Sequence, residues 1–260
     1  MKLTRFLHDS VKYTGLITDN TIREIKGDIF RNWTYTGEVF TVDEVKFLAP
    51  IEPNQIIGIG ANYVSKKEEL PSVLPEIPVF FFKPTSSVIG PDENIVIPEG
   101  IDKVKFESEL AVVIGKEAKN IAESEVFDYV YGYTIGNDVT APQFFHHDGH
   151  WTIGKSFDTF TPLGPVIETE FDPSVVSVEA VVNGIEKQNS STDLMIISIG
   201  KMISYLSNVM TLKPGDVILT GSPVGAELVG EGDTIECEIK GIGVLRNRFV
   251  TQEMAVCTNK

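Results

Sequence analysis

Residues 105–115 read KFESELAVVIG, the most informative stretch of the chain. If the stretch is a β-strand, successive side chains point to opposite faces. The buried face would then carry Phe106, Ser108, Leu110, Val112 and Ile114. Glu107 and Glu109 would project together from the other face. Two carboxylates a few ångströms apart repel each other, so the pair requires either full solvation or a cation.

A third acid, Asp138, stands at the end of another apolar stretch, residues 130–138. Three carboxylates without a cysteine offer hard oxygen ligands, which suit Mg²⁺, Mn²⁺ or Ca²⁺. The alternative is that Glu107 and Glu109 form the solvated face of an edge strand, because acids two positions apart are common on such faces. Spacing alone favours the solvated face.

The composition is that of a folded globular protein with an acidic surface. Hydrophobic residues make up 42% of the 260 residues and charged residues 23%, which excludes wholesale disorder. Lys and Arg total 22 against 37 Asp and Glu, and the net charge of −15 argues against nucleic acid or an anionic membrane as partner. An anionic substrate would therefore need local cations, from basic side chains or a bound metal.

The sequence predicts a cytoplasmic protein. Its first residues contain no apolar stretch of signal-peptide length, and no segment reaches the roughly 18 uninterrupted apolar residues of a membrane span. The two cysteines, Cys237 and Cys257, are too few for a disulfide framework, which fits a reducing compartment.

Short segments rich in Val, Ile, Phe and Thr, separated by 22 Gly and 14 Pro, predict a mainly β (α+β) fold with few helices. Strand-dominated chains of this length usually close into a barrel or form a sandwich. Residues 1–50 are expected to form a small N-terminal domain and residues 51–260 the main domain, because paired prolines in 49–53 suit a linker. The expected strands are 12–18, 34–41, 56–60, 79–83, 106–114, 130–138, 163–168, 176–182, 216–220, 234–239 and 243–249.

Two helices are expected within this β-rich chain. One is a short helix over residues 21–25. In the other, apolar residues between 194 and 206 recur near helical spacing. Thr192 or Asp193 could cap the start of this helix, and Asn208 lies near its end.

Several motifs resemble those of the fumarylacetoacetate hydrolase family and occur in the family's order. They are FESELAVVIG at 106–115, GNDVTA at 136–141, GKSFDTFTPLGP at 154–165, MTLKPGDVILTGSPVG at 210–225 and GIGVLRN at 241–247. The resemblance covers about residues 55–250 and implies a mixed β-sandwich or roll with a small N-terminal domain, usually in a homodimer. It also implies Mg²⁺ or Mn²⁺ bound by Glu107, Glu109 and Asp138, which reverses the preference for a solvated face.

The same resemblance implies roles for residues around the acids. Lys155 becomes the catalytic lysine, whose ammonium stabilises a developing enolate. Apart from the resemblance, the glycines of the loop that holds Thr220, Gly221 and Ser222 allow close backbone approach, so the loop is expected to bind substrate, with Thr220 offering a hydroxyl and an amide to a carboxylate. Lys83, which follows an aromatic run, is either a second substrate-binding cation near the acids or a plain lysine at a strand end.

Two features depart from the family pattern. Family hydrolases commonly carry a histidine and a glutamate three residues apart after a Gly-x-Asn-Tyr turn, where the glutamate orients the imidazole that deprotonates water. Here these catalytic positions are Lys66 and Glu69, and a lysine with a pKa of about 10.4 is a poor base. An arginine that many members carry is replaced by Pro142, which puts its contact to the substrate carboxylate in doubt.

Histidines gather in the stretch FFHHDGH at residues 144–150. His146, His147 and His150 suggest a zinc site, but adjacent histidines have poor ligand geometry on either a helix or a strand. A solvated loop is the favoured interpretation. One of these histidines could instead replace the base that is missing at Lys66.

Together these features predict a metal-dependent enzyme that acts on a small 2-oxo or diketo acid through a metal-stabilised enolate. Carbon–carbon bond hydrolysis is the broad activity that the resemblance implies, whereas Lys66 favours decarboxylation or isomerisation. The alternative is a catalytically silent homodimer that binds a dicarboxylate. Loss of the metal carboxylates would normally accompany such silence, and all three are present.

Overall fold

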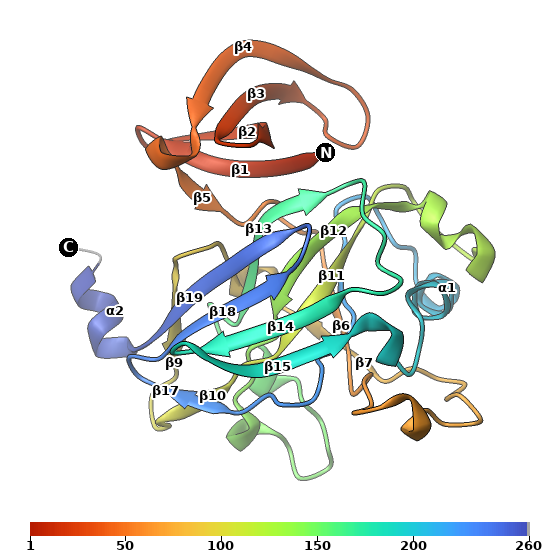
Figure 1. Cartoon of the computed structure of the whole chain (residues 1–260). Helices are drawn as coiled ribbons and strands as arrows, with labels where there is room; N and C mark the ends of the chain where they lie inside the picture. Colours follow the sequence, from red (N-terminus) through yellow and green to blue (C-terminus); the bar gives the residue numbers. More distant parts are fainter. Residues whose placement is uncertain (259–260) are drawn as a thin grey trace.

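The largest element of the protein is a 12-stranded sheet, seen in a computed structural model that describes residues 1–258 (Figure 1). Its strands are β1 (Lys2–His8), β2 (Val11–Thr18), β3 (Thr21–Gly27), β4 (Trp33–Thr41), β5 (Lys46–Leu48), β6 (Ile56–Ile59), β7 (Phe80–Lys83), β8 (Val88–Ile89), β11 (Ser108–Ile114), β12 (Val130–Asn137), β13 (Thr161–Glu168) and β16 (Val217–Leu219). The order across the sheet is β4-β3-β2-β1-β13-β12-β11-β16-β6-β7, with β5 on β1 and β8 on β13.

A second, five-stranded sheet packs over the centre of the first (Figure 1). Its order is β15 (Ile185–Ser191), β14 (Ser177–Val182), β18 (Thr234–Ile239), β19 (Gly243–Thr251) and β9 (Asn94–Ile97), and β10 (Lys103–Lys105) pairs with β17 (Leu228–Gly230) as a separate ribbon. Leu110 and Val112 of β11 share one core with Val178 of β14 and Ile235 of β18. The sandwich confirms the predicted fold class, mainly β with α1 (Ile199–Val209) and α2 (Gln252–Thr258) at its sides.

The N-terminal strands β1 to β4 form an antiparallel meander, which lies above the main body in Figure 1. Phe6, Ile22 and Phe40 make a small core of their own. Pairing of Leu3 with Ile167 joins β1 to β13, so the meander extends the main sheet. The domain boundary at residue 50 stays a prediction, because this pairing makes the two parts continuous.

The expected helix at residues 21–25 is wrong, because these residues begin β3. Thr18 pairs with Thr21 across a two-residue turn, and Asp19 takes the positive φ of 51° that such a hairpin turn requires. Ile22 is buried between β2 and β4. Long-range pairing of β-branched residues outweighs the weak preference of a five-residue segment for a helix.

The helix expected from residue 194 begins later, at Ile199. Ser198 is its N-cap, since the Ser198 hydroxyl accepts a hydrogen bond from the N–H of Lys201 at 3.1 Å. Thr192 and Asp193 instead belong to a separate turn, Thr192–Leu194, and the Thr192 hydroxyl donates to the carbonyl of Pro173 at 2.8 Å. The apolar residues of the turn and of the helix together happen to follow helical spacing, which is why the sequence predicts one longer helix.

Two further expectations concern membranes and cysteines. Within residues 1–258, no helix is long and apolar enough to cross a bilayer. Cys237 is buried in β18. The side chain of Cys257 lies outside the described residues, so its part in the redox argument stays a prediction.

Candidate metal centre and catalytic cavity

The three acids meet where the start of β11 lies beside the end of β12. Antiparallel pairing sets Glu109 opposite Gly136, and the N–H of Asp138 donates to the carbonyl of Glu107 at 2.9 Å. The side chain of Asn137 accepts a hydrogen bond from the N–H of Glu107 at 2.9 Å, which fixes the entry to β11. Carboxylate oxygens of Glu107, Glu109 and Asp138 consequently lie within 4.8 Å of one another.

Burial distinguishes this cluster from an ordinary acidic surface. β11 is an internal strand between β12 and β16, and all of its residues are buried. Glu109 is 2% exposed and Asp138 is 1% exposed. Both faces of the strand are covered, because Leu110 and Ala111 pack into different cores. The alternative of a solvated face on an edge strand is therefore wrong.

Two buried lysines face the acids. The ammonium of Lys155 donates to Oε2 of Glu107 at 2.6 Å and to Oδ2 of Asp138. Lys83, at the end of β7, donates to Oδ1 of Asp138 at 2.6 Å and to the carbonyl of Val139 at 3.2 Å. Of the two interpretations of Lys83, a plain strand-end lysine is wrong, since its side chain is fully buried at the acidic centre.

These contacts shift the pKa values of the cluster in different directions. Burial raises the pKa of Glu109 well above its usual value, and the charges of Asp138 and Glu107 raise it further. Burial also disfavours ionised Asp138, but Lys155 and Lys83 outweigh it and lower the pKa of this carboxyl. Burial lowers the pKa of the Lys155 ammonium, but the charges of Asp138 and Glu107 outweigh burial, and the net effect is a raised pKa. The pKa of Lys83 is lowered, chiefly by burial.

The donor set fits a hard divalent cation. The ligand atoms in the cluster are all carboxylate oxygens, the type that Mg²⁺ and Mn²⁺ prefer. Burial, together with the charges of Asp138 and Glu107, disfavours ionised Glu109 and raises its pKa, and a divalent cation among the three carboxylates would relieve this cost. Glu107, Glu109 and Asp138 are the residues that could hold the metal, as the sequence predicts.

A cavity of about 230 Å³ opens on these acids. One wall is aromatic: the rings of Phe81 and Trp151 meet edge to face at 5.7 Å, and Phe145 stacks on Trp151 at 6.0 Å. Gly60 also lines the cavity, and a side chain there would meet the Trp151 ring at 2.8 Å. A larger cavity, of about 760 Å³, lies beside β12 and α1 and has none of the three acids in its lining.

Only part of the expected substrate-binding loop faces the cavity and the acids. The N–H of Gly221 donates to Oε2 of Glu109 at 2.7 Å, and Ser222 lines the cavity. Thr220 is different, because its hydroxyl and its amide both donate to the carbonyl of Leu110, at 2.8 and 3.1 Å. The prediction that these two groups of Thr220 are free for a carboxylate is therefore wrong in this structure, where Thr220 ties the loop to β11.

Lys66 and Glu69 are not brought to the acids. Lys66 precedes the short turn Lys67–Glu69, and its side chain is 65% exposed with the ammonium 3.8 Å from Oε1 of Glu69. Neither residue is among those that line the cavity. The preceding turn does reach it, because Gly60 and Ala61 line the cavity. Asn62 anchors this turn by donating to the carbonyls of Ile197 and Thr220, at 3.0 and 2.8 Å. A catalytic role for Lys66 and Glu69 stays a prediction.

Lys105 is a site residue that the sequence argument missed. Its ammonium lies 2.9 Å from Oε1 of Glu107, it lines the cavity, and its side chain is 37% exposed. Reciprocal backbone hydrogen bonds to Thr140, at 2.7 and 2.9 Å, fix its position. The signal was available, since Lys105, Glu107 and Glu109 alternate with the buried residues of the same stretch.

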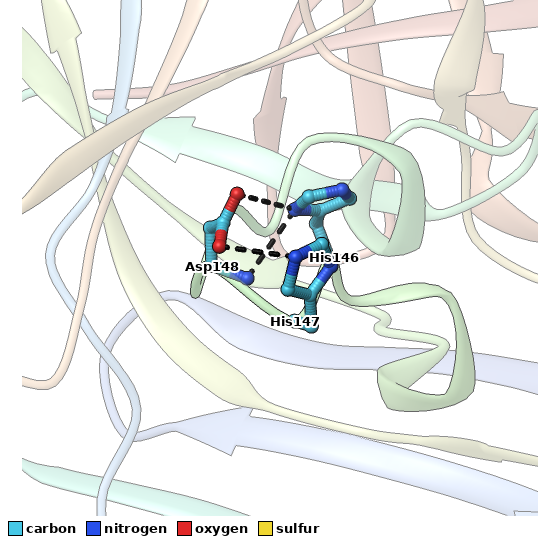
Figure 2. Close-up of side chains that lie close together, drawn as sticks. All are labelled: His146, His147 and Asp148. Carbon is cyan, nitrogen blue, oxygen red and sulfur yellow. Dashed lines mark hydrogen bonds and ion pairs between the residues drawn. The ribbon is translucent and has the colours of Figure 1, made fainter.

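The loop that follows Thr140 contains Pro142, where many family members carry an arginine, and the three clustered histidines. Pro142 starts the turn Pro142–Phe144, so no cation stands at that position. His146 and His147 are exposed, as expected of a solvated loop, and both lie close to Asp148 (Figure 2). None of the three histidines of this loop lines the cavity, so the structure does not place a replacement base there.

The sequence matches two known families. Residues 55–250 match the family described as fumarylacetoacetate (FAA) hydrolase C-terminal, and residues 1–50 match the family described as Rv2993c-like, N-terminal. A rat protein (Rattus norvegicus) named mitochondrial oxaloacetate tautomerase Fahd2a is 38% identical over 80% of this chain and 70% of its own.

Solved structures show the same fold. The 5-carboxymethyl-2-hydroxymuconate delta-isomerase of Mycobacterium smegmatis is 39% identical, with a TM-score of 0.91 over 97% of this chain and 100% of its own. The maleylpyruvate hydrolase of Sphingobium sp. SYK-6, in complex with manganese(II) and pyruvate, is 27% identical, with a TM-score of 0.81 over 96% of this chain and 99% of its own.

Proposed function

Because the chain belongs to the fumarylacetoacetate hydrolase family, we propose that it is a divalent-metal-dependent enzyme that relocates a proton on a small 2-oxo dicarboxylic acid. The observation that carries this proposal is the buried centre itself, in which Lys155 bridges Glu107 and Asp138 at the floor of a cavity. At about 230 Å³ the cavity is smaller than the roughly 300–1,000 Å³ of pockets for drug-sized ligands, which suits a small organic acid.

Names of the relatives support the substrate class. Oxaloacetate, 5-carboxymethyl-2-hydroxymuconate and maleylpyruvate each combine a 2-oxo acid, or its enol, with a further carboxylate. The cations of this site suit such a molecule, because Lys155 lies at the buried end of the cavity and Lys105 at its half-exposed edge. One carboxylate would enter beside the acids, and the other would remain within reach of Lys105.

Each side chain has a distinct task in this reaction. A divalent ion held by Glu107, Glu109 and Asp138 would supply Lewis acidity toward the 2-oxo and carboxylate oxygens. The Lys155 ammonium donates hydrogen bonds toward the oxygen on which negative charge develops. Lys83 holds Asp138 in place, and the aromatic wall keeps bulk water from the enolate.

Proton relocation fits the cavity better than hydrolysis. In tautomerisation a carboxylate of the cavity takes the C3 proton, and the C3–H electron pair forms the C2–C3 double bond. The carbonyl π pair moves to the 2-oxo oxygen, which receives a proton from the Lys155 ammonium, and the carboxylate returns its proton to Lys155, so no other reactant is consumed. Hydrolysis also needs a water molecule that is positioned and deprotonated for attack, and no imidazole of the described residues lines the cavity for that task. β-Decarboxylation instead breaks the C3–C4 bond, releases CO₂ and leaves the enolate of pyruvate. It is the expected side reaction with oxaloacetate, because its negative charge develops on the same 2-oxo oxygen.

A substrate panel tests this proposal. Oxaloacetate enol–keto exchange is followed by enol absorbance, its decarboxylation by pyruvate release, and acylpyruvate hydrolysis in parallel, each with Mg²⁺, Mn²⁺ or EDTA. We expect metal-dependent exchange well above the rate of a Glu109→Gln variant. Efficient acylpyruvate hydrolysis without enhanced exchange would contradict the proposal. Binding of Mn²⁺ and oxalate without any turnover would instead support a silent dicarboxylate-binding protein.

A further inference from the structure

A second group of metal-binding side chains lies at the tip of the loop between Phe145 and Trp151. Nδ1 of His146 is 3.3 Å from one oxygen of Asp148, and Nε2 of His147 is 3.2 Å from the other (Figure 2). The ligand atoms of His146, His147 and Asp148, here called the tip cluster, lie within 4.8 Å of one another. The tip cluster is separate from the buried acids, since it shares no residue with them.

A tight turn, not a helix or strand, gathers these side chains. The N–H of His146 donates to the carbonyl of His150 at 3.0 Å, and the N–H of Gly149 donates to the carbonyl of His146 at 2.9 Å. Gly149 has a φ of +84°, a conformation that favours glycine. The turn brings the ring of His150 to 6.2 Å from that of His146. On a helix or a strand, adjacent histidines have poor geometry for binding one metal ion. This turn is neither, so that objection does not apply here.

The ligand chemistry selects a different metal from that of the buried centre. The two imidazoles and one carboxylate of the tip cluster supply three of the four ligands that Zn²⁺ commonly takes, and His150, whose ring lies 6.2 Å from that of His146, is the nearest further imidazole. Imidazole nitrogens suit Zn²⁺, Ni²⁺ or Cu²⁺, whereas Mg²⁺ prefers oxygen. The exposure of the tip cluster leaves it open to an ion from solution, and water could complete the coordination.

The base of the same loop reaches the catalytic cavity. Phe145 and Trp151 stack on each other at the two ends of the tip and both line the cavity. An ion bound at the tip would cross-link residues between them and so restrain this aromatic wall. We propose that the tip cluster binds a transition-metal ion of the Zn²⁺ class and that occupancy rigidifies the loop over the cavity.

Zinc binding tests the site directly. Zn²⁺ is titrated into the full chain with Mg²⁺ in excess, and stoichiometry and affinity are measured by calorimetry. We expect one zinc at the tip, retained in Glu109→Gln, and affinity lowered about tenfold or more in His146→Ala/His147→Ala. The matched control is His8→Ala, because His8 lies on β1 and is not part of the tip cluster. Equal zinc affinity in the wild type and the double variant would overturn the proposal.

Tryptophan fluorescence tests the effect on the loop. Trp33 is the other tryptophan of the chain, so a Trp33→Phe variant makes Trp151 the single reporter. We expect Zn²⁺ to change the emission of Trp151 in this variant, and to leave it unchanged once His146 and His147 are also replaced by alanine. Zinc that binds at the tip without any change in Trp151 emission would refute the restraint of the cavity wall.

Discussion

Glu109 is a candidate metal ligand, and its burial lowers the folding stability of the metal-free protein. It is a carboxylate in the interior of a sheet, and burial together with Asp138 and Glu107 raises its pKa well above the usual value. The folded state therefore binds a proton at Glu109 more tightly than the unfolded state does. By linkage, the stability of the metal-free protein falls as the pH rises from the usual glutamate value toward the raised value.

The first prediction follows for Glu109→Gln. Without metal, at neutral pH, this variant is expected to melt at a higher temperature than the wild type, because a neutral amide avoids the burial of an ionised group. The difference should shrink as the pH is lowered from about 8 to about 5. Thermal melts in EDTA measure this, and Mn²⁺ titration should show much weaker binding by the variant. A variant less stable than the wild type throughout would contradict the assigned charge state.

Lys155 carries the second prediction, since its ammonium is held between Glu107 and Asp138. Lys155→Met is expected to lower kcat by about 10²–10³-fold, as loss of a preorganised donor does, while metal remains bound. Rate assays and metal analysis of the same samples measure both quantities. The matched control is Lys187→Met, because Lys187 pairs with Glu227 at 2.8 Å outside the cavity lining. Unchanged kcat in Lys155→Met would make this lysine structural.

The third prediction assigns substrate selection to Lys105. Removing its ammonium in Lys105→Met should raise KM for oxaloacetate roughly tenfold, because a charge-assisted contact to the second carboxylate is lost. The KM for the oxaloacetate 4-methyl ester should change little, since the ester lacks that charge. Lys103→Met is the control on the same strand, where the side chain is exposed. Equal effects on acid and ester would place the role of Lys105 in holding Glu107 alone.

At the scale of elements, the pairing of β11 with β12 builds the site, and much of it could be predicted from the sequence. Alternation within 105–115 correctly separates the two faces of the stretch. Leu110 lies in the core shared with β14, and the Ser108 hydroxyl donates to the carbonyl of Glu179 on β14, whereas Glu107 and Glu109 line the cavity. What alternation cannot give is the neighbour of each strand, so β11 could be read as an edge strand although it lies between β12 and β16. Sheet order depends on contacts between residues far apart in the chain.

Of the remaining wrong or missing predictions, one concerns a local turn and two concern contacts between distant residues. The hairpin at Asp19 is a turn signal that a local helix interpretation overlooked. Lys105 became a cavity residue only through its backbone bridge to Thr140, 35 positions later. Thr220 has the polar groups of a ligand-binding residue, yet Leu110 on the neighbouring strand takes both of its donors. The sequence gives the type of each side chain, but it does not give the residue that each side chain or backbone group contacts in the fold.

The fourth prediction concerns Lys66 and the turn Lys67–Glu69 that follows it, and the reaction that this segment favours. Lys66 at its start is exposed and charged, so the wild type is expected to hydrolyse acylpyruvates poorly relative to its action on oxaloacetate. Lys66→His should raise acylpyruvate hydrolysis, because an imidazole beside Glu69 is a competent base at neutral pH. Lys67→His is the matched control, since Lys67 pairs instead with Asp193 at 2.5 Å. Efficient hydrolysis by the wild type, with no gain in Lys66→His, would show that this segment does not select the reaction.

For the whole molecule, the open main sheet has two end strands, β4 and β7, and each presents an edge that could pair with another chain. The β7 end is also the more apolar one. Phe82 on β7 is 47% exposed, and the preceding segment exposes Val73, Ile77 and Val79. This end adjoins the catalytic cavity, because Phe81 of the same strand lines it. We therefore expect the homodimer that the family resemblance implies to form through the β7 edge.

The fifth prediction tests this assembly with matched variants at the two ends of the sheet. Phe82→Lys is expected to convert a dimer into a monomer, because it sets a charge in the apolar contact. Val39→Lys places the same charge on β4, where Val39 is 57% exposed, and should leave the dimer intact. Light scattering after size-exclusion chromatography measures the mass of the assembly. The buffer contains about 150 mM salt, because each chain carries a net charge of −15 and the repulsion between copies must be screened. A dimer that survives Phe82→Lys, or one that Val39→Lys dissolves, would place the interface elsewhere on the molecule.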